Sequence, residues 1–455
     1  MTILLSLIAA IFTIVSAGFG VTTLLVRRRI TGWDCLALPW LLGTATVSLA
    51  IWIGGFLLRG IALQLIVTAF CIGLGAIGWR CWQKFPAPEQ RRTADKIDKV
   101  CLALFALELA AMFWFSFQHT LGWDGLTVWE MKARFAFLNG GVLPADYFSD
   151  VARRFGHPEY PLLRPLTEAW CYLWIGDADQ FWIKLIFPIW YAATMSILFM
   201  AASEFSGKRW VGWIAILLFP LVPCVYSAPG GVQVGYADLP IAAIYIGAVF
   251  YLLRILRDNT RDAMSIFVAL AATLPWMKRE GTILWLAISL CGAVAIYRRR
   301  GLGLAFLSFL PGIVVMAAWG FFLRLVHAVP SRDFIPISLA TLKANPGRIG
   351  PITQKLFIEM SDLRAWDLFW VIAVVALICA LLRNRSAVTA VVVWLWIAPL
   401  LCYCASYIFS AWPDFSAHID TSLPRLLLQL TPVVWLLIAV AIAPKIDIYS
   451  SANAA

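Results

Sequence analysis

The sequence predicts an all-α integral membrane protein with about 13 transmembrane segments and a large first outer loop that carries short helices. Three observations lead to this fold class. Hydrophobic residues make up 62% of the 455 residues and charged residues only 13%. The mean hydropathy of +0.83 lies outside the range of soluble globular proteins. The apolar residues form runs of membrane-spanning length, and basic clusters separate these runs.

The net charge of +11 does not indicate a nucleic-acid-binding surface. The basic residues stand in short clusters between apolar runs, such as Arg27-Arg28-Arg29. This pattern is typical of cytoplasmic loop ends that obey the positive-inside rule. The ten cysteines are scattered, mostly within apolar runs, without the paired spacing of a metal site. We therefore expect membrane lipids, and no nucleic acid, among the partners.

Each span needs about 20 apolar residues, and the basic clusters orient the candidates. The predicted segments are 2–26, 35–58, 61–78, 100–118, 181–203, 210–226, 239–256, 263–276, 282–297, 302–326, 365–382, 387–409 and 423–443. The first segment lacks a basic start and ends at a triple arginine, so we expect a retained span with its N-terminus outside rather than a cleaved signal peptide. Segment 166–179 is short and amphipathic, and we expect it to lie on the membrane surface.

This scheme gives a key outer loop at 119–165 and a second outer loop at 327–364. The run 263–276 is too short to cross fully, because a helix rises about 1.5 Å per residue. Its charged end, Lys278-Arg279-Glu280, should therefore lie below the outer surface, inside protein. The notable polar residues all reach the same side in this scheme: Asp124, His157, Asp238, Lys278, Arg279, Glu280, Asp414, His418 and Arg425. We expect them to share one cavity at the outer face.

Asp124 stands directly after a span, between Trp123 and Gly125. Its carboxylate would be ionised at neutral pH and able to accept a proton or to position a hydroxyl. The alternative role is an N-cap for the helix expected at 126–138, because Asp is a preferred cap residue. The two roles are compatible.

The Lys278-Arg279-Glu280 cluster is the stronger functional signal. Each charge at membrane depth costs about 2.5 to 3.5 kcal/mol, so such groups usually persist for a ligand or an ion partner. Lys278 or Arg279 there could bind a phosphate and stabilise the charge on a departing phosphate oxygen. The alternative is an outer hairpin turn in which Glu280 neutralises a neighbour.

Three further segments supply candidate binding residues. In His157-Pro158-Glu159-Tyr160-Pro161 the prolines fix an extended segment that orients His157 and Tyr160. His157 could bind substrate hydroxyls or a metal, or it could tie the loop to its neighbours. Tyr236 and Asp238 begin a later span, and Asp238 is either a helix cap or a second acid of the cavity, with capping slightly favoured.

The start of the last span carries the final pair of candidates. His418 and Arg425 flank this start. Arg425 could contact a lipid phosphate, or it could extend to the membrane surface as long basic side chains commonly do.

Together these motifs resemble the GT-C superfamily of integral-membrane glycosyltransferases, in particular bacterial members related to the dolichyl-phosphate-mannose mannosyltransferase and aminoarabinose-transferase group. The motifs that carry the resemblance are Trp123-Asp124 in a large first outer loop, His157 to Pro161, Gly235 to Asp238, Lys278 to Gly281 and His418 to Arg425. The resemblance divides the chain into a three-span addition with a cytoplasmic connector at 1–99, a GT-C-like catalytic module at 100–443 and a cytoplasmic tail at 444–455.

The resemblance implies a hexosyl- or pentosyl-type transferase in the bacterial inner membrane, with its active site facing the periplasm. The donor would be a polyprenyl-phosphate sugar, the acceptor a cell-envelope glycan, lipid or protein, and the anomeric carbon would be inverted. Asp124 would take the acceptor's proton, and Lys278, Arg279 and Arg425 would bind the donor phosphate. The expected substrate-binding residues are His157, Tyr160, Tyr236, Asp238, Glu280 and His418.

Metal dependence stays open at this stage, because many members of the group have two adjacent acids where this chain has Asp124 followed by Gly125. No cofactor is certain, and a divalent metal is possible. Two other functions remain as alternatives. A transporter or flippase for lipid-linked sugars would use the same charges to line a pathway, although no internal repeat is found. An oligosaccharide ligase or polymerase would instead use the second outer loop.

Overall fold

The computed structural model describes residues 2–86, 95–226, 231–383 and 386–443. Within these ranges the chain is helical, and the only extended pairing is an isolated bridge between Phe334 and Ser410. The predicted tail at 444–455, part of the predicted connector (87–94) and part of the turn before Tyr236 (227–230) lie outside the described residues.

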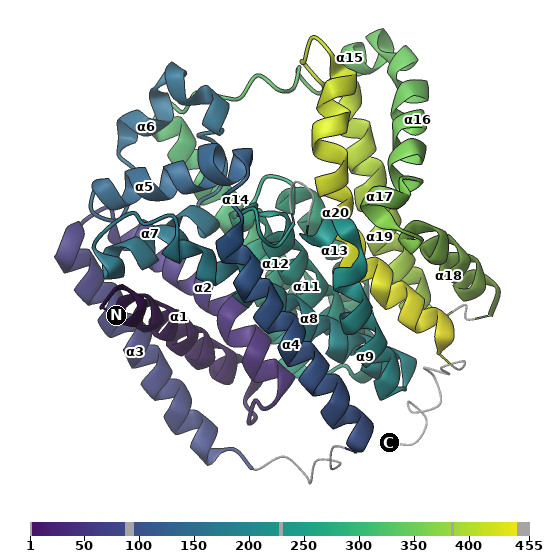
Figure 1. Cartoon of the computed structure of the whole chain (residues 1–455), viewed down its shortest axis with the longest axis horizontal. Coiled ribbons are helices and arrows are strands. Elements are labelled where there is room, and N and C mark those ends of the chain that lie inside the picture. Colours follow the sequence, from purple (N-terminus) through teal and green to yellow (C-terminus); the bar gives the residue numbers. More distant parts are fainter. Residues whose placement is uncertain (1, 87–94, 227–230, 384–385, 444–455) are drawn as a thin grey trace.

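The helices are connected by short turns and two longer loops (Figure 1). They are α1 (Thr2–Val26), α2 (Trp33–Gly54), α3 (Gly60–Lys84), α4 (Lys96–Gln118), α5 (Met131–Leu138), α6 (Ala145–Ser149), α7 (Leu163–Ile175), α8 (Ile186–Ser206), α9 (Arg209–Leu218), α10 (Pro223–Tyr226), α11 (Asp238–Asp258), α12 (Arg261–Met277), α13 (Gly281–Arg300), α14 (Leu302–Leu325), α15 (Leu339–Ala344), α16 (Ile349–Met360), α17 (Leu363–Trp366), α18 (Phe369–Arg383), α19 (Ala387–Ser406) and α20 (Phe415–Ile442).

Ten helices of the described chain are long and apolar enough to cross a membrane. The protein is therefore a multi-pass α-helical membrane protein. The three predicted spans that do not reach this length are the sixth, the eighth and the eleventh. The sixth is broken into α9, a 3-10 turn and α10, where Pro220 and Pro223 interrupt the helix. The eighth and eleventh correspond to α12, with 17 residues, and α18, with 15 residues.

Helix α7 differs from its prediction. The amphipathic pattern was expected to lie on the membrane surface, but every residue from Leu163 to Tyr172 is buried, and α7 packs against α1, α2 and α5. The physical reason is that Arg164 and Glu168 form an ion pair one turn apart at 2.5 Å, which stabilises both charges inside the bundle although Arg164 Nε and Nη1 and Glu168 Oε2 have no hydrogen-bond partner in the described chain.

The last helix begins eight residues earlier than predicted. Asp414 caps α20, and its Oδ1 accepts hydrogen bonds from the backbone N–H groups of Ser416 (2.9 Å) and Ala417 (3.3 Å). His418 therefore lies in the first turn of a helix rather than in a loop before it, and Arg425 lies in the third turn of the same helix. This fixes the direction in which both side chains extend.

The N-terminal helices are tied into the rest of the bundle. Helix α2 packs along α7 and α8. The indole N–H groups of Trp170 and Trp276 donate to Thr13 and Ser48 at 2.9 Å. The buried apolar residues form one continuous core that includes these helices.

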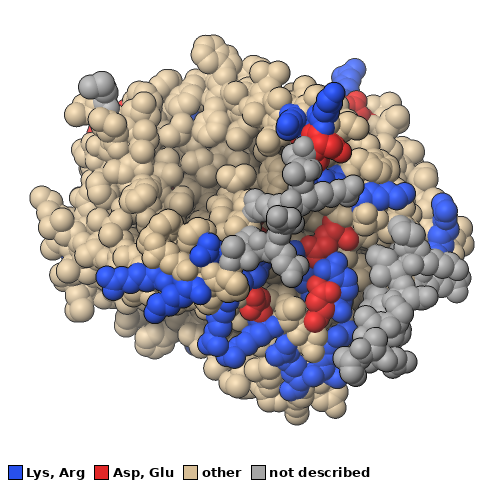
Figure 2. Space-filling model, turned by 90° about the horizontal axis from the view of Figure 1, so that it is seen from below, with Lys and Arg blue, Asp and Glu red and all other residues tan. Residues whose placement is uncertain are grey.

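The two ends of the bundle differ in character. Helices α5, α6, α15 and α16 lie at the upper end in Figure 1, and α3 ends and α4 begins at the lower end. Figure 2 views the molecule from below and shows many Lys and Arg side chains gathered on this lower face. Because α11 runs through the core for 21 residues, its two ends are about 30 Å apart. The two sites described below lie at these opposite ends.

Candidate functional site

The candidate site begins where the loop after α4 crosses the turn before α11. The Gly122 N–H donates to the Val234 carbonyl at 2.8 Å. A Cβ atom at Gly125 would lie only 2.3 Å from the same oxygen, so only glycine allows this approach. A second acidic side chain directly after Asp124 therefore has no room in this chain.

Asp124 is fixed by this crossing. Its backbone N–H donates to the Tyr236 hydroxyl at 3.2 Å. Burial raises the pKa of Tyr236, so the hydroxyl keeps its proton at neutral pH. The Asp124 side chain makes no capping hydrogen bond, which leaves its carboxylate to face the interior of the site. The capping role considered for Asp124 is not found.

Arg425 of α20 connects two acids from distant parts of the chain. Its Nη1 lies 2.7 Å from Asp124 Oδ2, and its Nε lies 3.4 Å from Asp238 Oδ2. The guanidinium group also lies over the Tyr236 ring, 4.9 Å from the ring centroid. Arg425 thus helps to join the segment after α4 to the start of α11.

Asp238 is fully buried and does not cap α11, because Ala237 occupies that position. The slight preference for capping was wrong. The Asp238 Oδ1 atom instead lies 2.8 Å from Lys278 Nζ and accepts a hydrogen bond from Gln429 Nε2 at 2.6 Å. The Tyr403 hydroxyl in turn donates to Gln429 at 2.7 Å. These contacts hold a charge inside the bundle at the start of α11.

Lys278 is only 1% exposed, and its ammonium group contacts two carboxylates. It lies 2.8 Å from Asp238 and 3.0 Å from Glu280. The second oxygen of Glu280 is buried without a hydrogen-bond partner in the described chain. Lys278 therefore neutralises the interior acids in this state, and its expected contact with a donor phosphate stays a prediction.

Arg279 differs from its neighbour in exposure and pairing. Its side chain is exposed, and its guanidinium group lies over the Phe334 ring at 5.4 Å. It forms no ion pair with any residue that the structure describes. Arg279 is the most accessible cation of the cluster, and it directly precedes Glu280 in the chain.

His157 lies at the edge of this cluster, in a left-handed backbone conformation with φ of 50°. Its Nδ1 is 3.3 Å from Asp333 Oδ2 of the second outer loop, and its ring stacks on Tyr160 at 4.6 Å. Of the roles considered for His157, the contact between loops is the one observed. Asp333 was missed by sequence reasoning, because nothing in its local sequence distinguishes it from other loop acids.

His418 is joined to the same group through Trp412. The two rings stack at 4.7 Å, and the Trp412 indole N–H donates to Asp333 Oδ1 at 3.1 Å. His418 Nδ1 also forms a hydrogen bond with the Ser410 hydroxyl at 2.8 Å. Segments 119–165 and 327–364 and the start of α20 therefore meet around Asp333.

Lys132 is a second residue that sequence reasoning missed. It is fully buried, and its ammonium group donates to the His157 carbonyl at 2.7 Å. It lies over the rings of Trp129 and Tyr160 at 5.6 and 5.4 Å. Burial lowers the pKa of Lys132 to about 7, against the opposing charges of Glu159 and Asp124. Lys132 thus links the helix that follows Asp124 to the proline-bounded segment.

The cluster thus brings together most of the predicted residues. Asp124, Tyr236, Asp238, Lys278, Glu280 and Arg425 are connected by direct contacts. Tyr160 lies close enough for the charges of Glu280, Arg279 and Arg425 to act on its hydroxyl. Within the described ranges, no group of three or more His, Cys, Asp or Glu residues is arranged to hold a metal ion.

The arrangement has a clear chemical capacity. It presents a carboxylate on a loop, an arginine that contacts this carboxylate, a second, exposed arginine and a buried ion pair between Lys278 and Asp238 beneath them. Such a site can accept a proton and bind an anionic oxygen next to each other. Comparisons with protein-family models, with curated proteins and with solved structures gave no match to this chain.

Proposed function

We propose that the protein is a glycosyltransferase that moves a sugar from a polyprenyl-phosphate donor to an acceptor at the outer membrane face, with inversion. The observation that carries this proposal is the contact of Arg425 with Asp124, supported from below by Asp238 and Lys278. A base and a phosphate-binding cation are the two groups that this reaction needs close together.

In the proposed transfer step, each proton, bond and charge is assigned to these residues and the two substrates. The acceptor hydroxyl gives its proton to the Asp124 carboxylate while its oxygen forms a bond to the anomeric carbon. The bond from that carbon to the phosphate oxygen breaks on the opposite face, which inverts the configuration. The electron pair leaves with the polyprenyl phosphate, whose charge Arg425 and Arg279 stabilise.

The ion pair between Asp124 and Arg425 requires an exchange before reaction. The Asp124 oxygen that contacts the guanidinium group at 2.7 Å is occupied by that contact and is not free to accept the acceptor's proton. A donor phosphate that binds Arg425 would compete with Asp124 for the same N–H groups. Donor binding would then release Asp124 to accept the acceptor's proton. The Asp238 contact holds the other side of Arg425 during this exchange.

The charge of the two ends supports an outward-facing site. The site lies at the start of α11 and α20, and basic side chains gather at the opposite end of the bundle (Figure 2). The positive-inside rule assigns the basic end to the cytoplasm. The site would then face outward, which in the bacterial inner membrane is the periplasm.

The test is transfer of radiolabelled sugar from a panel of polyprenyl-phosphate sugars by purified protein in detergent. Wild type should form product, and Asp124→Asn should form none. In a parallel equilibrium assay with polyprenyl phosphate, Asp124→Asn should bind at least as tightly as wild type, because the competing carboxylate is gone. Asp146→Asn, on α6, is the matched control and should behave as wild type in both assays.

The outcomes separate the candidate functions. Transfer by Asp124→Asn would remove its role as the base. Weaker phosphate binding by Asp124→Asn would refute the exchange at Arg425. If no donor gives product and the protein instead moves lipid-linked sugar across vesicle membranes, the transporter alternative replaces the enzyme.

A further inference from the structure

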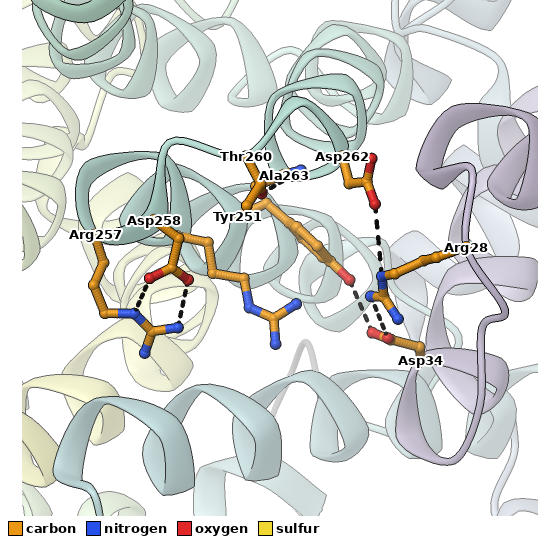
Figure 3. Close-up of a pocket in the computed structure, with 9 residues that line it drawn as sticks. Arg28, Asp34, Tyr251, Arg257, Asp258, Thr260, Asp262 and Ala263 are labelled. Carbon is orange, nitrogen blue, oxygen red and sulfur yellow. Dashed lines mark hydrogen bonds and ion pairs between the residues drawn. The ribbon is translucent and has the colours of Figure 1, made fainter. Parts of the chain in front are cut away.

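A second polar site lies at the basic end of the bundle, at the opposite end of α11 from Asp238 and about 30 Å from it. It is a cavity of about 330 Å³, a volume at the lower end of the range for small-molecule sites. The lining residues are Arg28, Asp34, Tyr251, Arg254, Arg257, Asp258, Thr260, Asp262 and Ala263 (Figure 3). They come from the loop after α1, the start of α2, the end of α11 and the start of α12.

Two of the arginines keep unused hydrogen-bond donors. Arg254 directs Nε and Nη2 to Glu204, which leaves both hydrogens of Nη1 without a protein acceptor in the described chain. Arg28 donates from Nη2 to Asp34 at 2.9 Å, and its Nη1 is likewise unused there. A guanidinium group has five donors, so both can bind another anionic group without giving up their present partners.

The three carboxylates that line the cavity differ in how many hydrogen-bond donors they already have. Asp34 accepts from Arg28 and from the Tyr251 hydroxyl, each at 2.9 Å. Both oxygens of Asp258 accept from Arg257 at 2.6 Å. Asp262 makes no side-chain hydrogen bond within the described ranges, and its one ion pair, with Arg28 Nε, is long at 3.8 Å. Figure 3 shows the Asp262 carboxylate across from Asp34, with Arg28 between them.

The cavity therefore offers unused hydrogen-bond donors on Arg28 and Arg254, and one carboxylate, Asp262, that accepts no side-chain hydrogen bond within the described ranges. We propose that it binds the headgroup of a zwitterionic phospholipid, with the phosphate on Arg28 and Arg254 and a primary ammonium group on Asp262. A purely anionic headgroup fits less well, because Asp34, Asp258 and Asp262 line the same space. A quaternary ammonium group cannot donate a hydrogen bond to Asp262, so a phosphoethanolamine headgroup is preferred over phosphocholine.

The position of the cavity favours a lipid over a soluble ligand. Arg28 stands two residues after the end of α1, and Arg254 to Asp258 form the last turn of α11. Both helices are long and apolar enough to span the membrane, so their ends lie at the level of the lipid headgroups. A lipid that enters from the bilayer would reach this level without leaving the membrane.

The test compares lipids in nanodiscs at fixed total lipid. Phosphatidylcholine discs would be supplemented with phosphatidylethanolamine or with phosphatidylglycerol, and bound lipid would be measured by native mass spectrometry after release from the disc. Phosphatidylethanolamine should be retained about tenfold more than either competitor, which corresponds to one good charge-assisted contact. Glycerophosphoethanolamine, added to the protein in detergent, tests whether the ligand is a free soluble molecule rather than a membrane lipid.

Two variants and a control assign the contacts. Asp262→Asn should abolish the preference for phosphatidylethanolamine over phosphatidylcholine. Arg28→Lys should weaken retention of both lipids, because both carry the phosphate. Asp177→Asn, an exposed acid elsewhere on the chain, should change neither.

Three results would overturn the proposal. They are equal retention of all three lipids by wild type, a preference for phosphatidylglycerol, and an unchanged preference in Asp262→Asn. Binding of glycerophosphoethanolamine with no retained lipid would overturn the lipid source.

Discussion

Replacing Lys278 by methionine should destabilise the protein through Asp238. Methionine keeps most of the side-chain length but removes the ammonium group, and Asp238 is fully buried. Removing one partner of a buried ion pair costs about 3 to 5 kcal/mol. Asp238 would keep the hydrogen bond from Gln429 at 2.6 Å and the more distant Arg425 at 3.4 Å. We therefore expect a loss at the lower end, about 3 kcal/mol of unfolding free energy.

The assay is equilibrium unfolding of purified protein in mixed detergent and SDS, followed by tryptophan fluorescence. The double variant Lys278→Met with Asp238→Asn should recover most of the loss, because a neutral amide no longer needs a cation. Arg279→Met is the matched control, and it should change the unfolding free energy by less than about 0.5 kcal/mol because this side chain is exposed. If Lys278→Met unfolds like wild type, or if the double variant recovers nothing, then Lys278 does not stabilise Asp238.

Three further predictions concern the site. Arg279→Ala should raise the donor KM several-fold while the unfolding midpoint stays unchanged, and equal donor dependence in both proteins would exclude a phosphate contact. Unfolding free energy should rise as the pH rises from about 7 toward 10.5, because the pKa of Lys132 falls from 10.5 to about 7 on folding and the unfolded chain alone binds the proton in that window. Lys132→Met should flatten this rise in unfolding free energy, and a variant with the same pH profile as wild type would contradict the assignment to Lys132. Gly125→Ala should disrupt the outer loop, because its Cβ would lie 2.3 Å from the Val234 carbonyl. The expected measurement is faster limited proteolysis in 119–165, and wild-type resistance would show that the crossing can relax.

The sequence predicts membrane-spanning helices well where they are long and evenly apolar. The predicted bounds of α1 match the structure, and those of α14 differ by one residue. Basic clusters also placed Asp124, Asp238, Lys278 and Arg425 on one side, and these residues are in contact in the structure. The pairing itself could not be predicted, because it depends on how each helix is rotated about its axis.

The remaining errors have identifiable physical causes. The amphipathic pattern of α7 has the same period whether its polar face meets water or an internal ion pair, so the pattern could not show that Arg164 is buried. The early start of α20 was readable from Asp414, a preferred cap residue, but polar residues at 414–422 obscured it. Asp333 and Lys132 gain their roles only through contacts between loops far apart in the chain.

Helix α11 is held at both ends, by Asp238 at one end and by Arg254, Arg257 and Asp258 at the other. Its 21 residues give a rod of about 30 Å, close to the thickness of the hydrocarbon core of a bilayer. A helix anchored in this way cannot slide to suit a thicker membrane without breaking the ion pairs at one of its ends. The activity of the protein should therefore depend on bilayer thickness. In vesicles of graded acyl-chain length, we expect an optimum where the hydrocarbon core is about 30 Å thick. A flat response across that series would show that the ends of α11 are free to adjust.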